Sequence, residues 1–288
     1  MNVCMLSFDV EDWFQVENLR EVFPRESWNY QRLRVVENTH RLLDVLERYG
    51  AKATFFVLGW IAEKVPGLVK DIYSAGHEIA SHGFAHELIY NQTLEEFKED
   101  IHRSKRVLED LIGTAVLGYR APSFSITDEA IDVLVAEGFK YDSSLFPSFY
   151  HDRYGKLATL KAERHTSVIE VQTGFYEVLI PTLFLFGKKL PWGGGGYFRV
   201  IPYSIFRVGV KRLLAEVGSY LFYLHPWEID PYQPRIKDIR FSFRFRHYAG
   251  LKGTLSKLER LIRDFRFISI KEGLEKLGYL SPKTTKEG

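Results

Sequence analysis

The sequence predicts a parallel α/β fold, either an open sheet or a barrel. Buried strand patterns alternate with amphipathic helix patterns six times in the first half of the chain, at intervals of roughly 20–35 residues, which is the rhythm of repeated β-α units. The chain has 288 residues, of which 45% are hydrophobic and 26% charged, so it is long enough for one large α/β domain or two small ones. No internal repeat and no linker rich in proline or serine divides it. We therefore expect a single domain over residues 1–280.

Each strand is predicted by a short apolar run, and each helix by apolar residues three and four positions apart. The strands expected in the first half are Val3–Phe8, Ala53–Leu58, His77–Ala80, Ala115–Tyr119 and Phe139–Tyr141. The helices between them are Leu33–Tyr49, Ile61–Ala75, a segment from the capping pair Thr93 and Glu96 to Ile112, and a segment from Thr127 to Glu137. The rhythm returns with helix Tyr203–Val217, strand Tyr220–Leu224, helix Gly253–Phe265, strand Phe267–Ser269 and a helix that ends at Leu277.

Three segments interrupt this rhythm. Residues 145–200 are interpreted as an insertion, with a hairpin at Ser167–Phe186 and a glycine-rich loop at Pro191–Gly196. That loop lacks the lysine of a phosphate-binding loop, so we interpret it as a flap or as backbone that approaches a ligand closely. Residues 229–280 form a C-terminal extension, in which Arg240–His247 alternates phenylalanine with arginine and predicts a half-buried strand with a basic face. Residues 281–288 are expected to be a flexible tail.

Composition excludes several classes of protein. The 39 basic and 37 acidic residues give a net charge of +2, without the basic excess of a nucleic-acid-binding protein. Cys4 is the only cysteine, which excludes an internal disulfide, and its apolar surroundings predict a buried thiol. The longest apolar run, Val178–Phe186, falls short of the about 20 residues that a membrane helix needs. With no leader pattern at the start, we expect a cytoplasmic protein.

Polar side chains follow five of the predicted strands. The carboxyl ends of strands in an α/β barrel converge on one mouth, where active sites lie. Buried charge is costly unless it is paired or bound to a metal, so packing alone does not explain charged residues at so many strand ends. The residues in question are Asp9, Glu11 and Asp12, then Ser81–His86, Arg120–Ser123, Asp142 and His225–Glu228.

His82 and His86 indicate a metal site. They are four residues apart, so one helical turn would place both imidazoles on the same side. Two imidazoles and a carboxylate make a three-ligand site with an open position for water, which is typical of catalytic zinc. Asp9, nearest the strand, is interpreted as the base that takes a proton from the metal-bound water, and either Glu11 or Asp12 as the third ligand.

His225 suits the opposite role, that of a general acid that protonates the leaving group. Arg120 and Asp142 allow two interpretations. They form a structural ion pair, or Arg120 orients the base Asp9 while Asp142 fixes Arg120. One such pair can serve both purposes.

With these residues identified, the chain resembles the polysaccharide deacetylases of the NodB-homology type, carbohydrate esterase family 4. Five motifs match in order: SFDVEDW at Ser7–Trp13, SHGFAH at Ser81–His86, RAPSF at Arg120–Phe124, YDSS at Tyr141–Ser144 and LHPWE at Leu224–Glu228. The segments PWGGGGYFR and the basic, aromatic C-terminal stretch are similar to the members associated with exopolysaccharide and exosortase gene clusters. The resemblance implies a distorted (β/α)7-type barrel with a hairpin insertion and a C-terminal extension.

The resemblance also implies metal-dependent hydrolysis of N-acetyl groups on sugars. It supports Asp9 as base, His82 and His86 as ligands, and His225 as acid. The family motif has two adjacent aspartates, whereas Val10 follows Asp9 here, so the choice between Glu11 and Asp12 stays open. Zinc suits the ligand set best, and cobalt, nickel and iron fit the same shell.

Three further residues are candidates for substrate contacts. The backbone N–H that follows Pro122, that of Ser123, is placed to stabilise an oxyanion, a contact worth about 3 kcal/mol when well aligned. Trp227 is a candidate for stacking on a sugar ring, with rim packing as the equal alternative. Trp13 and Trp192, which flank other motifs, are weaker candidates for the same role.

The sequence predicts an N-acetylated sugar or oligosaccharide as the partner. The basic face of Arg240–His247, with Arg244 and Arg246, suggests that the sugar carries a diphosphate. Two other functions remain open, namely metal-independent hydrolysis of cyclic amides on the same fold (as in allantoinases) and non-catalytic glycan binding. The oligomeric state is not predicted.

Overall fold

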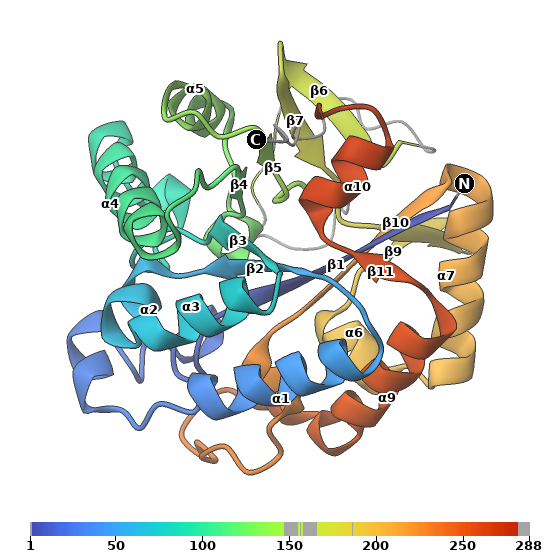
Figure 1. Ribbon diagram of the computed structural model, residues 1–288. Helices are drawn as coiled ribbons and strands as arrows, with labels where there is room; N and C mark the ends of the chain where they lie inside the picture. The colour runs from blue at the N-terminus through green and yellow to red at the C-terminus, as the bar shows by residue number, and fades with distance from the viewer. Residues whose placement is uncertain (1, 147–154, 156, 158–165, 186, 282–288) are drawn as a thin grey trace.

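The computed structural model confirms the predicted α/β fold and shows a sheet that curls into an incomplete barrel (Figure 1). It describes residues 2–146, 155, 157, 166–185 and 187–281. In this part of the chain the sheet contains β1 (Val3–Val10), β2 (Thr54–Val57), β3 (Glu78–Ser81), β4 (Gly118–Tyr119), β5 (Tyr141–Asp142), β6 (Val168–Gln172), β7 (Phe175–Val178), β10 (Ser219–Leu224) and β11 (Phe267–Ile268). The spatial order is β10-β1-β2-β3-β4-β5-β7-β6, with β11 beside the start of β1. The pairings are parallel except between β6 and β7.

Helices surround the outer face of this sheet (Figure 1). They are α1 (Val35–Arg48), α2 (Gly59–Lys64), α3 (Pro66–Ser74), α4 (Leu94–Ile112), α5 (Asp128–Ala136), α7 (Tyr203–Val217) and α9 (Leu251–Asp264). The capping box predicted from Thr93 and Glu96 is present at the start of α4. The single helix predicted over Ile61–Ala75 is instead two helices, because Pro66 starts α3 and cannot continue the hydrogen bonding of α2.

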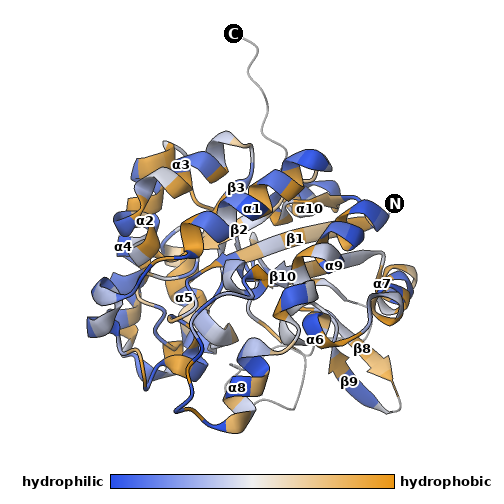
Figure 2. Ribbon diagram, turned by 90° about the horizontal axis from the view of Figure 1, so that it is seen from below, coloured by the Kyte–Doolittle hydropathy of each residue, from blue (hydrophilic) through white to orange (hydrophobic). Residues whose placement is uncertain are grey.

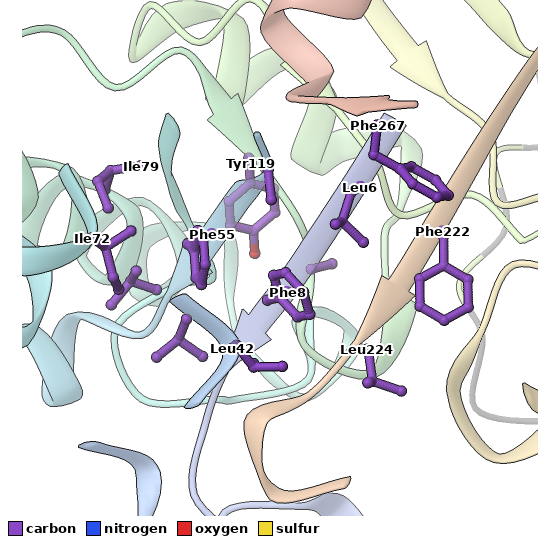
Figure 3. Close-up of a cluster of buried hydrophobic side chains, with 14 of the residues drawn as sticks. Leu6, Phe8, Leu42, Phe55, Ile72, Ile79, Tyr119, Phe222, Leu224 and Phe267 are labelled. Carbon is purple, nitrogen blue, oxygen red and sulfur yellow. The ribbon is translucent and has the colours of Figure 1, made fainter. Parts of the chain in front are cut away.

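Alternate residues of β1 face opposite sides of the sheet, and this alternation separates the core from the site. Leu6 and Phe8 point to the helices, where they pack with side chains such as Leu42 of α1 and Phe222 of β10 (Figure 3). Met5 belongs to a second cluster inside the barrel. Because side chains in a strand repeat every second residue, the odd-numbered positions that follow Met5 also face the barrel interior.

The interior is closed at its amino-terminal end by α10 (Ile270–Lys276). Ile270 and Leu274 of this helix pack with Val3 and Met5. The close contact with Met5 requires the glycine at position 273, since a Cβ there would lie 2.5 Å from the methionine sulfur. In the described part of the chain, α10 thus covers the amino-terminal end of the barrel, and the carboxyl ends of the strands form the opposite mouth.

The insertion completes the barrel wall between the edge strands β6 and β10. The predicted hairpin consists of β6 and β7, and β8 (Thr182–Leu185) and β9 (Lys188–Pro191) form a second hairpin. Backbone hydrogen bonds connect Ile180 to Leu145, Trp192 to Pro181 and Tyr223 to Gly193. The glycine-rich segment is therefore wall rather than flap. A Cβ at position 194 would lie 1.9 Å from the carbonyl oxygen of Tyr223.

The C-terminal extension contains a correction. The segment Arg240–His247 is not a strand, because residues Phe241–Tyr248 form the helix α8. Its carboxyl end is stabilised by Arg199 of α6 (Gly195–Val200), which donates hydrogen bonds to the carbonyl groups of Arg246, His247 and Ala249. These bonds satisfy carbonyls that a helix end leaves unpaired.

The described helices are all too short or too polar to cross a lipid bilayer. Cys4 is buried as predicted, and burial raises the pKa of its thiol to about 12. Most of the predicted tail, residues 282–288, and parts of the insertion lie outside the described residues.

Candidate active site

A cleft of about 440 Å³ opens at the carboxyl ends of β1, β3 and β10. Its base comes from residues that follow these strands, and its rim from α6 and α8. Seven of the eleven predicted site residues line this cleft: Asp9, Glu11, His82, His86, Ser123, His225 and Trp227. The other four, Asp12, Arg120, Pro122 and Asp142, are buried behind it.

Glu11, His82 and His86 form a cluster whose donor set fits a metal ion. One donor atom from each side chain lies within 4.8 Å of the others, and all three residues are buried. His86 Nε2 is 2.8 Å from Glu11 Oε2, and the two imidazole rings are 5.4 Å apart. Two imidazoles and one carboxylate are ligands that divalent zinc accepts while leaving a position open.

His82 has the tautomer that metal binding requires. Its Nδ1 lies 2.8 Å from the carbonyl oxygen of Arg120, and because a carbonyl only accepts, Nδ1 carries the proton. Burial lowers the pKa of His82 to about 4, so the ring is neutral at pH 7. Its Nε2 therefore presents a lone pair to the cluster.

A loop, rather than the expected helical turn, brings the two histidines together. Gly83 and His86 have left-handed φ angles of 73° and 54°. The carboxylate of Asp100 on α4 accepts hydrogen bonds from the backbone N–H groups of Phe84 and Ala85, at 2.7 and 3.1 Å. Asp100 is a supporting residue that the motif analysis did not include.

Asp12, the alternative ligand, lies outside this cluster. Its carboxylate accepts hydrogen bonds from the backbone N–H groups of Trp13, Arg34 and Val35, and so fixes the chain at the start of α1. β1 ends at Val10, and the Glu11 N–H donates to the Asp9 carbonyl oxygen in the turn that follows, from which Glu11 reaches the cleft and Asp12 does not. Of the two candidates, the geometry brings only Glu11 to the histidines.

Asp9 and Arg120 form a buried ion pair beside the metal-binding cluster. Asp9 Oδ1 is 2.6 Å from Arg120 Nη1. The same guanidinium donates to the hydroxyl of Ser7 and to both the carbonyl and the hydroxyl of Ser143, and lies 4.2 Å from the ring centroid of Phe56. The expected orientation of Asp9 by Arg120 is therefore present in the geometry.

Asp142 does not fix Arg120, contrary to expectation, and Ser143 occupies that position instead. Asp142 accepts hydrogen bonds from the hydroxyl and the backbone N–H of Ser144, at 2.6 and 3.1 Å. The Ser144 hydroxyl in turn accepts from the N–H of Ala121. Asp142 therefore supports the backbone next to Arg120 through the Ser144 hydroxyl, without contacting the guanidinium.

A second carboxyl group, that of Glu177 on β7, lies against Asp142. Burial raises the pKa of Asp142, and burial together with the Asp142 charge raises the pKa of Glu177 well above its usual range. Glu177 Oε1 accepts hydrogen bonds from the N–H groups of Ser144 and Leu145. This arrangement favours a proton held between the two carboxyls, as is typical of closely placed acids.

His225 lies on the opposite side of the cleft from the histidine pair and is held by Glu228. Its Nδ1 is 2.7 Å from Glu228 Oε1, and its Nε2 is 3.2 Å from Glu11 Oε1. Burial would lower the pKa of His225, but the charges of Glu11, Glu228 and Asp9 outweigh it and raise the pKa to about 9. The imidazolium is thus a proton donor facing the cleft.

Glu228 is the last residue of the LHPWE motif, but the sequence analysis gave it no role of its own. It is buried, and its second oxygen lies 2.7 Å from Nε of the buried Arg199. Its spacing of three residues from His225 is a sequence signal from which the contact between the two side chains could have been predicted. Arg199 closes the PWGGGGYFR segment, but its distance from Glu228 in the sequence gave no signal of this contact.

The loop after β4 has a strained backbone at the cleft. Ser123 and Phe124 have φ angles of 51° and 60°, in a region that residues other than glycine seldom adopt. Both residues line the cleft, and Pro122 precedes them in the buried turn η4 (Pro122–Phe124). Strain of this kind persists where surrounding contacts fix a functional conformation.

The tryptophans divide between core and cleft. Trp13 packs edge-on against Phe14, and Trp192 stacks on Phe206, so both belong to the hydrophobic core. Trp227 lines the cleft, with its Nε1 3.3 Å from Glu11 Oε1 and its ring stacked on His247.

Comparison with known proteins agrees with this geometry. The family model described as polysaccharide deacetylase matches residues 27–141, which contain the loop of His82 and His86 and the Arg120 segment. This match covers less than half of the chain. A second model, described as a domain of unknown function (DUF3473), matches residues 143–275, which include His225, α6 and α8.

Similar proteins include a peptidoglycan deacetylase from Helicobacter pylori, 31% identical over 52% of the chain and 57% of the relative. A peptidoglycan deacetylase-like protein from Gibberella zeae is 32% identical over 50% of the chain and 49% of the relative. The chain thus spans about half the length of these two relatives. A crystal structure assigned to the polysaccharide deacetylases, from Mycobacterium smegmatis, has a TM-score of 0.63 at 19% identity and covers 100% of this chain and 95% of that one. The last similarity establishes the fold.

Proposed function

We propose that the protein is a metal-dependent hydrolase that removes N-acetyl groups from an N-acetylated sugar. The observation that carries this proposal is the convergence of Glu11, His82 and His86 with an arginine-bound carboxylate on one side and a histidine on the other. The match to the polysaccharide deacetylase family model, and the deacetylase names of the similar proteins, support the same reaction.

Glu11, His82 and His86 would hold the metal, with zinc the first choice and cobalt, nickel and iron as alternatives. A bound divalent ion would polarise the acetyl carbonyl and lower the pKa of water to about 7. Asp9, fixed by Arg120, takes the proton from the attacking water. His225 gives its proton to the departing amine, and the Glu228 carboxylate, 2.7 Å from its Nδ1, favours the protonated ring.

The residues around this centre would position the sugar. Ser123 lines the cleft, and its N–H would stabilise the oxyanion. Trp227 lines the same cleft and would contact the sugar. Arg246 also lines the cleft, which supports a substrate that carries a phosphate or diphosphate. We propose a place in exopolysaccharide or cell-envelope glycan synthesis, which rests on the resemblance carried by the PWGGGGYFR segment.

Acetate release tests this function. Purified protein loaded with zinc is incubated with N-acetylglucosamine oligosaccharides, with peptidoglycan and, separately, with allantoin. We expect acetate from an N-acetylated glycan, and a loss of roughly 10²–10⁴-fold in kcat for His225→Ala, which lacks the general acid. An exposed histidine, His102, provides the control, because His102→Ala leaves the rate unchanged.

Other outcomes would contradict the proposal. Ring opening of allantoin without metal would indicate a cyclic-amide hydrolase. Glycan binding without acetate release from any N-acetylated substrate would indicate a binding protein.

A further inference from the structure

Helix α8 exposes aromatic side chains to solvent beside the cleft. Phe241 is 72% exposed and Phe245, one helical turn later, is 57% exposed. Residues four apart lie on the same side of a helix, so the two rings form one apolar strip. Figure 2 shows α8 at the edge of the molecule, with hydrophobic and hydrophilic residues side by side.

Basic side chains surround this strip. The segment 235–246 contains five basic residues and one acidic residue, although the whole chain has a net charge of only +2. Arg240, Arg244 and Arg246 are exposed, and none forms an ion pair with an acidic residue in the described part of the chain. The guanidinium of Arg244 lies 5.6 Å from the ring centroid of Phe241, so charge and apolar surface are interleaved.

The strip is held rigidly by contacts on its inner side. Arg199 bonds the carboxyl end of α8, and His247 stacks on Trp227. The Tyr248 hydroxyl donates to the carbonyl oxygen of Pro234 and accepts from the N–H of Ile236. The exposed rings are therefore presented by a preformed helix rather than by a loose segment.

The strip is continuous with the mouth of the cleft. Phe245 and Arg246 line the cleft together with Tyr197 and Val200 of α6, which are themselves exposed. Whatever covers α8 therefore lies beside the entrance through which a glycan would reach the metal-binding cluster.

We propose that α8 docks the protein on an anionic lipid bilayer, with the cleft entrance at the bilayer surface. Phenylalanine interleaved with arginine is the pattern of a helix that lies in a membrane interface, where the rings enter the acyl boundary and the cations meet acidic headgroups. A second copy of the chain fits less well, because two such faces would bring like charges together. A double-stranded nucleic acid would meet the arginine side chains but, with its bases stacked inside the duplex, would leave the exposed phenylalanine rings without an apolar contact.

Flotation with vesicles tests this docking and needs no measurement of activity, so its failure is separate from a failure of the proposed deacetylase function. Vesicles of equimolar phosphatidylglycerol and phosphatidylcholine should carry the full chain upward in a density gradient at low salt, and vesicles of phosphatidylcholine alone should carry much less. Phe241→Ser with Phe245→Ser should reduce the bound fraction about tenfold. Arg240→Gln and Arg244→Gln should each weaken binding roughly fivefold.

Two variants serve as matched controls. Tyr30→Ser removes an aromatic side chain that is 87% exposed on η2 (Arg25–Tyr30), and Arg106→Gln removes an exposed arginine on α4. Both should bind vesicles as the original chain does, and all variants should keep its melting temperature because every changed side chain is exposed.

Three results would overturn the proposal. The first is no flotation with anionic vesicles, and the second is flotation that the α8 substitutions leave unchanged. The third is a lipid-free dimer in sedimentation velocity that Phe241→Ser with Phe245→Ser converts to a monomer, since the strip would then be an interface between copies of the chain.

Discussion

Asp9, Glu11 and Asp12 are three carboxylates within four residues, and each has a different environment. Asp9 faces a guanidinium, Glu11 faces imidazoles, and Asp12 faces backbone N–H groups. Burial would raise the pKa of Glu11, but His86, His225 and His82 lower it to about 2. Burial raises the pKa of Asp12 to about 6 in spite of its hydrogen bonds. Neighbouring acids of one motif thus have different environments, because Asp9 lies in β1 while Glu11 and Asp12 lie in the turn after it.

Residue-level reasoning from the sequence found the chemistry but not all of the partners. Strand periodicity did not decide between Glu11 and Asp12, because β1 ends at Val10 and both acids lie in the turn that follows. The expected contact between Asp142 and Arg120 was wrong because Asp142 pairs with Tyr119 across β4 and β5, and the next residue, Ser143, is the one that contacts the Arg120 guanidinium. No local pattern marks a serine as such a partner.

The buried pair of Asp142 and Glu177 predicts a pH dependence of stability. The raised pKa values mean that the folded chain keeps a proton that the unfolded chain loses above pH 4.5. This contribution to stability is complete at low pH and is lost as the pH rises towards the raised pKa. Glu177→Gln keeps the Oε1 acceptor and supplies an N–H for Asp142, so its free energy of unfolding should fall less between pH 5 and pH 9 than that of the original chain. Urea unfolding across this range measures the difference.

Glu63→Gln is the control for this prediction, since Glu63 is a partly exposed acid paired with Arg103. It should keep the original pH dependence. An identical slope for Glu177→Gln and the original chain would mean that the two carboxyls do not share a proton.

At the scale of elements, α8 shows why a local pattern was misleading. The alternation of phenylalanine and arginine over Arg240–Arg246 favours a strand. In the structure, Arg199 donates hydrogen bonds to the carbonyl groups at the carboxyl end of the helix. Arg199 lies more than forty positions earlier in the chain, so the propensities of the helix residues themselves do not predict this contact. The predicted helices with strong local signals, such as α4 with its capping box, were found where expected.

Arg199 joins α8 to the proposed general acid, which leads to a prediction for Arg199→Ala. The substitution leaves the Glu228 carboxylate buried without its cation and frees the carbonyls at the end of α8. We expect a loss of about 3–5 kcal/mol in the free energy of unfolding. Hydrogen exchange in α8 should become faster, while exchange in α4 on the far side of the sheet stays protected.

A conservative variant separates charge from geometry. Arg199→Lys keeps a cation near Glu228 but cannot bond three carbonyls at once, so it should restore part of the stability and little of the protection in α8. Protection in α8 that is unchanged in both variants would show that Arg199 does not hold this helix.

At the scale of the whole molecule, the fold was predictable because its rhythm is regular. The order of β1 to β5 with their helices follows from apolar runs, caps and strand ends alone. What the sequence did not predict is long-range closure. The wall segment between β6 and β10 is held by contacts such as the hydrogen bond from Tyr223 to Gly193. Gly193 lies in a segment that has no β-α pattern, so this contact could not be predicted from periodicity.

Buried histidines predict that the metal-free protein loses stability in acid. Burial, with a smaller effect from Lys52, lowers the pKa of His77 from 6.5 to about 4. Neutral His77 therefore contributes up to about 3 kcal/mol to the free energy of unfolding. This contribution is complete above pH 6.5 and is lost as the pH falls to about 4. His77→Gln can still accept the N–H of Ala53, so it should unfold with a shallower loss of stability between pH 6.5 and pH 4.

Chemical denaturation at each pH gives this comparison, with His102→Gln as the exposed control. If His77→Gln loses as much free energy of unfolding between pH 6.5 and pH 4 as the original chain does, His77 is not the cause of the acid sensitivity.

The most direct test of the proposed metal centre is the zinc content of the purified chain after loading and gel filtration, measured by elemental analysis. The geometry predicts one equivalent of zinc in the original chain and in Asp12→Asn, whose carboxylate contacts only backbone N–H groups near α1. It predicts that Glu11→Gln and the double variant His82→Ala/His86→Ala lose the metal, because each removes donors from the cluster. No zinc in the original chain, or zinc retained by Glu11→Gln and the histidine double variant, would contradict the account.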